Sequence, residues 1–93
     1  MEILTTMIKF RCRKSAMSEQ TSSSYIFKFD NGAYIIKIFV PKSKLIVMQD
    51  KKMTEYNECI IPKCVFMKTK NLKENVDVVR ETQHVEIIED INN

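Results

Sequence analysis

Apolar and polar residues alternate strictly near the start of the chain, in residues 8–13 (IKFRCR). Three apolar side chains would lie on one face of a strand, and the cations Lys9, Arg11 and Arg13 on the other. A period of two indicates a half-buried strand, because successive side chains of a strand point to opposite faces. Residues 15–24 (SAMSEQTSSS) are too polar to pack, and they predict a flexible Ser-rich loop.

Two further strand-like runs, residues 25–30 and 33–40, flank the dipeptide Asn31-Gly32. This dipeptide predicts a type I′ hairpin turn, because both central residues of that turn have positive φ. The turn would set the register of the hairpin, with Asp30 directly opposite Ala33. The face expected to form the core then carries Tyr25, Phe27, Phe29, Tyr34, Ile36, Ile38 and Val40.

The second half of the chain has a weaker periodicity. A short apolar run over residues 45–48 predicts one strand. Residues 59–67 predict another, which Pro62 interrupts and therefore places at a sheet edge or a bulge. Residues 72–81 follow the start of a capping-box-like sequence (NLKE) and predict one short helix, although their valines also suit a strand. Residues 85–91 predict a final strand.

The composition favours a β-rich fold. Twelve Ile, seven Val and six Thr outnumber the five Ala and Leu residues. Such β-branched side chains pack well on a pleated sheet and lose rotamer freedom in a helix. A chain of 93 residues forms one domain with a modest core. We therefore expect a mainly β protein, a single small antiparallel β-barrel or sandwich over residues 1–93, with at most one short helix near residues 72–81.

Charge is distributed unevenly along the chain. Residues 1–73 carry a net charge of +8, whereas the acidic C-terminal segment, residues 74–93, carries −5. This asymmetry indicates either a basic binding surface or an acidic segment that docks on the basic strands. Because residues 76–91 contain seven β-branched apolar residues, we expect the acidic segment to bury them against the body of the domain.

Few residues could carry chemistry. Cys59 and Cys64 could form a zinc site with Cys12 and His84, but the chain has no second closely spaced pair, so buried structural thiols are the favoured interpretation. The sequence has no Gly-rich phosphate loop, no HExxH motif and no nucleophile motif. We therefore expect no enzymatic activity, no cofactor and no metal. Three cysteines without a secretory signal predict a cytoplasmic protein, and no segment reaches the roughly 20 apolar residues of a membrane span.

These observations favour a non-enzymatic protein-binding module. The second face of the hairpin combines apolar groups with cations and is the predicted partner-binding surface. Its residues are Ile26, Lys28, Ile35, Lys37 and Phe39. The abundance of Lys, Ile and Asn is typical of AT-rich coding, so we expect a viral or phage-type inhibitor of a host protein or complex. A homodimer through a β-strand edge is a further expectation.

The alternative is a small basic nucleic-acid-binding protein. In that case phosphates would be contacted by Lys9, Arg11, Arg13, Lys42 and Lys44. Exposed aromatic side chains would stack on bases. Against this interpretation, Tyr25, Phe27, Phe29 and Tyr34 share the face expected to form the core, and the chain has only three Arg.

Overall fold

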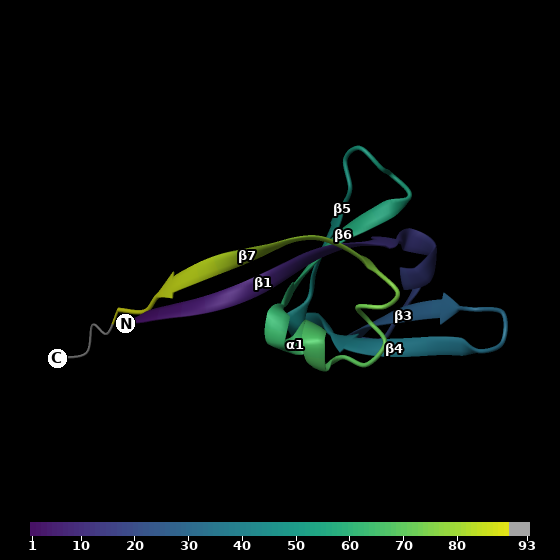
Figure 1. Ribbon diagram of the computed structural model, residues 1–93, viewed down its shortest axis with the longest axis horizontal. Helices are drawn as coiled ribbons and strands as arrows, with labels where there is room; N and C mark the ends of the chain where they lie inside the picture. Colours follow the sequence, from purple (N-terminus) through teal and green to yellow (C-terminus); the bar gives the residue numbers. More distant parts are fainter. Residues whose placement is uncertain (90–93) are drawn as a thin grey trace.

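A computed structural model describes residues 1–89 and contains two antiparallel sheets (Figure 1). The larger sheet has the strand order β5-β6-β1-β7 and the smaller has the order β2-β3-β4. The elements are β1 (Glu2–Arg13), the 3-10 helix η1 (Lys14–Met17), β2 (Glu19–Gln20), β3 (Ser24–Asp30), β4 (Ile35–Pro41), the 3-10 helix η2 (Lys42–Lys44), β5 (Ile46–Gln49), β6 (Tyr56–Pro62), the α-helix α1 (Lys63–Lys68) and β7 (Asp77–Ile87). The prediction of a mainly β fold is confirmed, and within residues 1–89 the strands do not close into a barrel.

Residues of both sheets and of α1 form the hydrophobic core. Phe10 of β1 is fully buried, and its ring centroid lies 5.9 Å from that of Phe27 in β3 and 5.6 Å from that of Phe66 in α1. The alternation in residues 8–13 explains this position, because Ile8, Phe10 and Cys12 all belong to the core as predicted. Burying a side chain as large as phenylalanine stabilises the fold by about 1.5–3 kcal/mol.

Strand β1 extends well beyond the predicted residues 8–13. Its residues 7–13 pair with β6, and its residues 2–11 pair with β7 across a bulge at Lys9/Phe10. Within the described residues, residues 2–6 therefore pair with β7 and with no other strand. These two strands project from the body, and the N-terminus lies at their tip (Figure 1). The molecule consequently measures 59 × 27 × 22 Å.

The β3–β4 hairpin has a longer turn than predicted. Asp30 pairs with Ile35 and not with Ala33, so residues 31–34 form a four-residue loop. The Asp30 carboxylate accepts a hydrogen bond of 2.8 Å from the N–H of Gly32, whose φ of 90° suits glycine. Side-chain bonds of this kind stabilise a loop that the two-residue turn pattern does not foresee.

The shift of register leaves the faces of the hairpin as predicted. It amounts to two residues, and the side-chain period of a strand is also two, so each paired residue stays on its expected face. Phe27, Ile38 and Val40 are accordingly buried. Tyr34, expected in the core, lies instead in the loop and is 61% exposed.

The Ser-rich stretch over residues 15–24, predicted to be a flexible loop, is partly regular structure. It includes most of η1 and all of β2, whose two residues pair with β3. The hydroxyl of Thr21 accepts a hydrogen bond of 2.9 Å from the N–H of Ser24 and closes the turn into β3. Polar side chains that bond to the nearby backbone can thus order a segment that has little to bury.

The α-helix forms at residues 63–68, not at residues 72–81, and residues 59–67 are not one strand. β6 ends at Pro62, which has no N–H for the ladder and whose φ of −58° suits the start of a helix. The capping-box-like sequence does not begin a helix, because Asn71 has a left-handed φ of 68°. No helix within residues 1–89 has the length and apolar character needed to cross a membrane.

The acidic segment pairs with the body, but the prediction that it buries its apolar side chains is largely wrong. Val76 packs against the core, whereas every residue of β7 is exposed. β7 is an edge strand of the larger sheet, so β1 lies on one side of it and no strand of residues 1–89 pairs with the other side. β7 thus pairs with β1 through its backbone, whereas its side chains remain exposed to solvent. Ile91 lies outside the described residues.

Candidate protein-binding surfaces

The row of cations predicted on β1 is neutralised by neighbouring carboxylates. These carboxylates belong to β6 and to the loop before it, because β6 lies beside this half of β1. The acidic C-terminal segment supplies none of them. A phosphate group would have to displace an existing partner from each cation. The three pairs are Lys9–Glu58 at 3.1 Å, Arg11–Asp50 at 2.9 Å and Arg13–Glu55 at 3.8 Å.

Asp50 is a buried carboxylate with three hydrogen-bond donors. Its Oδ1 accepts bonds of 3.0 Å and 2.9 Å from the N–H groups of Met53 and Lys52, and its Oδ2 accepts a bond from Nε of Arg11. These bonds, that from Met53 first, hold the pKa of Asp50 below its ordinary value. The carboxylate is therefore ionised, and the three hydrogen bonds that it accepts hold the loop between β5 and β6 in place.

The other two cations proposed to contact nucleic acid, Lys42 and Lys44, lie in η2. This helix connects β4 of the smaller sheet to β5 of the larger sheet. The Lys42 ammonium lies 5.4 Å from the ring centroid of Tyr25, and Lys44 is exposed. The five proposed contacts are thus divided between a neutralised row on β1 and a separate connection between the sheets.

An ion-pair cluster crosses the predicted partner-binding face of the hairpin. Lys28 of β3 and Lys37 of β4 are directly opposite each other. Glu19 of β2 lies 3.8 Å from the Lys28 ammonium and 3.4 Å from the Lys37 ammonium. One carboxylate therefore serves both lysines, which removes much of their mutual repulsion.

The three apolar residues of that face do not form one accessible patch. Ile26 is buried, whereas Ile35 and Phe39 are 52% and 57% exposed. Lys37 lies between the two exposed side chains along β4. The hairpin face therefore offers two separate apolar groups, and single exposed apolar groups are ordinary on protein surfaces.

Two of the three cysteines are core residues. Burial raises the pKa of Cys12 to about 11 and that of Cys59 to about 12, which keeps both as unreactive thiols. Cys64 is exposed on α1, and His84 lies in β7 opposite Thr5. Within residues 1–89 no three His, Cys, Asp or Glu side chains come close enough together to hold a metal ion.

Many exposed apolar side chains lie on the projecting strands, which we call the β1–β7 arm and define as residues 1–6 and 81–89, and they are divided between its two faces. Six large apolar side chains of this short segment are at least 38% exposed. An isolated two-stranded ribbon is only marginally stable in water, so the arm is a natural place for a partner to dock. The six residues are Met1, Ile3, Leu4, Val85, Ile87 and Ile88.

An open hollow of about 560 Å³ lies between the arm and α1. Leu4, Thr5 and Thr6 form its wall on β1, while Cys64 and Met67 belong to the wall on α1. Leu4 pairs directly with Val85, so an apolar stripe of the arm continues from this hollow toward the tip. The hollow is thus the inner end of the surface that the arm exposes.

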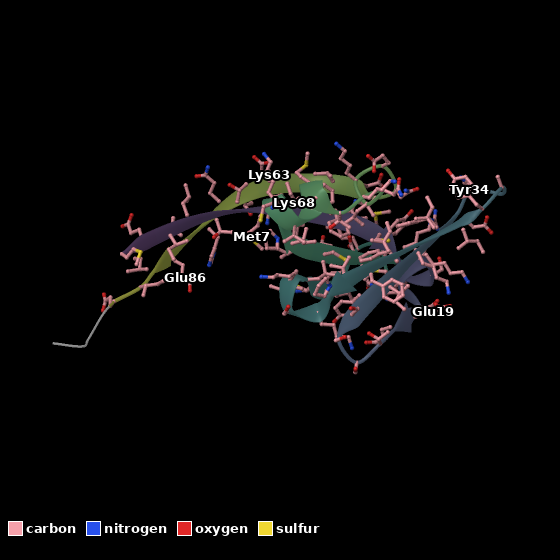
Figure 2. All side chains as sticks on the ribbon, turned by 90° about the horizontal axis from the view of Figure 1, so that it is seen from below. Met7, Glu19, Tyr34, Lys63, Lys68 and Glu86 are labelled. Carbon is pink, nitrogen blue, oxygen red and sulfur yellow. The ribbon has the colours of Figure 1, made fainter. Side chains whose placement is uncertain are left out.

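The arm is acidic as well as apolar. Its residues include four carboxylates and neither Lys nor Arg. Figure 2 shows one of them, Glu86, toward the free end of the arm, and Tyr34 at the opposite end of the molecule. Sequence reasoning did not find this surface, because residues 2–7 (EILTTM) do not alternate as residues 8–13 do. The β-branched Ile3, Thr5 and Thr6 are the signal that could have extended the predicted strand toward the N-terminus.

Comparison with models of protein families, with curated proteins and with solved structures finds no match. The function is therefore argued from the geometry of the chain.

Proposed function

We propose that this chain is a non-enzymatic protein-binding module whose β1–β7 arm docks on a protein partner. The observation that carries the proposal is the arm itself, with exposed apolar side chains on both strands and an open edge along β7. Apolar groups surrounded by polar ones are typical of protein interfaces. An open strand edge also offers backbone N–H and C=O groups for strand addition.

The charges of the arm favour a protein over a nucleic acid. The arm has four carboxylates and neither Lys nor Arg, so its net charge is negative even with the N-terminal ammonium group, and it would repel phosphates. The cations of β1 that could contact phosphates already have carboxylate partners within 4 Å. Nucleic-acid binding would have to use the lysines of loops and η2 and is therefore the less supported function.

An inhibitory role toward a host protein fits this mode of binding. A small module that adds a strand or an apolar arm to another protein can block a surface without chemistry of its own. The three free cysteines fit a reducing compartment such as the cytoplasm. The composition typical of AT-rich coding remains the reason to place this role in a virus or phage.

Capture from cells that produce the protein tests the proposal when two variants are compared with the natural chain. Leu4→Lys with Val85→Lys changes the arm, and Ile35→Lys with Phe39→Lys makes a matched change on the hairpin face. All four side chains are more than half exposed. Because Leu4 and Val85 are directly opposite each other, the arm variant places two like charges together, and circular dichroism must show that both variants keep the fold before capture is compared. We expect the arm variant alone to lose the captured protein.

If the hairpin variant alone lost the captured protein, the binding site would lie on the hairpin face and not on the arm. Retention of single- or double-stranded DNA that weakens steeply with salt would favour the nucleic-acid alternative. Neither the natural chain nor its variants should show such retention if the proposal is correct.

A further inference from the structure

The arm leaves one long strand edge open. Within residues 1–89, β7 has eleven residues and no strand on its outer side. The other edge strands are less suited to pairing: β5 has four residues, β2 has two, and β4 carries Lys37 and ends at Pro41. Short length, charged side chains and Pro are features by which proteins protect sheet edges. β7 is long and has no Pro, but it carries four charged residues, so a strand that pairs with it must match those charges. β7 is therefore the edge at which strand addition is expected.

Three of the four charged residues of β7 form no ion pair within the described residues, namely Asp77, Arg80 and Glu86, whereas Glu81 is bound by Lys63 at 2.8 Å. Arg80 forms no ion pair there, and it lies directly opposite another cation, Lys9, whose ammonium is already bound to Glu58. Like charges directly opposite each other destabilise a sheet. Glu86 also forms no ion pair within residues 1–89 and lies opposite Ile3. Each of the two side chains would be stabilised by an opposite charge from outside.

We propose that β7 pairs with β7 of a second copy of this chain, antiparallel about a two-fold axis at Gln83. This inference rests on the proposed function and names the partner of the same arm. In this register Arg80 is directly opposite Glu86 of the second copy, and the contact occurs twice. Glu81 is opposite Val85 of the second copy, and Thr82 is opposite His84. No two like charges oppose each other between residues 80 and 86.

The pairing also agrees with the geometry of a sheet. Residues that oppose each other across the axis are both even or both odd in number, so the core faces of the two copies lie on the same side. The two larger sheets then join into one antiparallel sheet of eight strands. The two bodies lie at opposite ends of the paired arms, because each arm tip points toward the base of the other.

The size of the molecule supports a second copy as the occupant. A folded monomer of 11.0 kDa is expected to expose about 5,600 Å², and this chain exposes 6764 Å². Its radius of gyration is 15.3 Å, against about 12 Å for a compact chain of this length. The excess surface, about 1,100 Å², exceeds the roughly 800 Å² that each partner contributes to a standard interface.

Charge reversal on the full-length chain tests this register. Arg80→Glu and Glu86→Arg should each weaken association, because each replaces two attractions by two repulsions. The double variant, Arg80→Glu with Glu86→Arg, restores both contacts and should dimerise as the natural chain does. Sedimentation equilibrium over a wide concentration range would measure this as a rise toward twice the 11.0 kDa of one chain. We expect a loss on the order of tenfold in the association constant for each single variant.

Lys51→Glu, on the exposed loop between β5 and β6, is the matched control and should leave association unchanged. A dimer that neither single variant weakens would overturn the pairing of β7. A chain that stays monomeric at every concentration would overturn the inference but leave the proposed function standing, provided that the Leu4→Lys and Val85→Lys variant still loses a captured protein. Restoration in the double variant would show that the single variants failed through charge and not through misfolding.

Discussion

The carboxylate of Asp50 joins two parts of the larger sheet that are distant in sequence. It accepts bonds from the backbone of the loop between β5 and β6 and from Arg11 on the central strand β1. The same bond gives Arg11 its partner, so one buried acid both orders the loop and neutralises part of the cation row. The alternation in β1 predicts which face carries the cations. It cannot predict their partners, because these lie about forty to fifty residues later, in β6 and in the loop before it, and a local period does not contain such contacts.

Replacing Asp50 should therefore change how stability depends on pH. Its pKa in the folded protein lies below the ordinary value of 3.8, so its stabilising effect is complete above pH 3.8 and is lost as the pH falls through the folded pKa. We expect Asp50→Asn to lower the melting temperature at neutral pH, and the difference from the natural chain to shrink in acid. Thermal unfolding followed by circular dichroism measures both.

The exposed Glu74→Gln serves as the control for this change and should follow the natural chain at every pH. A deficit for Asp50→Asn that is the same in acid and at neutral pH would mean that the lost bonds do not depend on ionisation.

At the level of elements, the sequence predicted strands far better than the helix. The alternation in residues 8–13 and the two runs of the hairpin correspond to β1, β3 and β4, because a period of two is a local property. The helix was misplaced because Pro62 is compatible both with the end of a strand and with the start of a helix. Which of the two forms depends on tertiary packing, since α1 forms where it can pack on the core. Phe66 of α1 packs on Phe10, a contact between residues fifty-six positions apart that no local pattern contains.

The turn between α1 and β7 depends on Leu72. This side chain is fully buried in the core, although its neighbours on both sides are more accessible. We expect Leu72→Ala to lower the free energy of unfolding by about 2–5 kcal/mol, through lost burial and the cavity left behind. The same change at the 59% exposed Leu4 should cost no more than about 0.5 kcal/mol. Urea unfolding of both variants gives the comparison, and equal costs would contradict the placement of Leu72.

At the scale of the whole molecule, the candidate site arises where two ends of the chain meet. Residues 1–6 and 81–89 form the arm, and the N-terminal amino group donates a hydrogen bond of 2.8 Å to the carbonyl oxygen of Ile88. Sequence reasoning predicted a β-rich protein-binding module with an acidic C-terminal segment, because both features follow from the amino-acid composition. It placed the exposed apolar surface on the hairpin, since it assumed that seven β-branched residues near the C-terminus would be covered. In the structure four of them, Val78, Val79, Val85 and Ile87, lie on β7 at a sheet edge and are exposed within the described residues.

Deleting residues 74–93 tests how the acidic segment serves the fold. The deletion removes β7, which would leave residues 2–6 unpaired and the rest of β1 with an open edge beside the core. It also removes Val76 from the core. An open, alternating strand of this kind is a template for aggregation. We therefore expect the shortened chain to lose cooperative unfolding and to aggregate, whereas deletion of residues 89–93 alone, which leaves β7 intact, should not.

The same deletion separates two roles for the negative charge. If the acidic segment served to mask a basic surface, the shortened chain would stay folded and gain affinity for DNA. The structure argues against that role, because the carboxylates that neutralise Lys9, Arg11 and Arg13 lie in residues 50–58 and would remain after the deletion. We expect no gain in DNA affinity in any soluble fraction, measured by fluorescence anisotropy at low salt. A folded, DNA-binding product would show that the segment acts as an electrostatic mimic of nucleic acid.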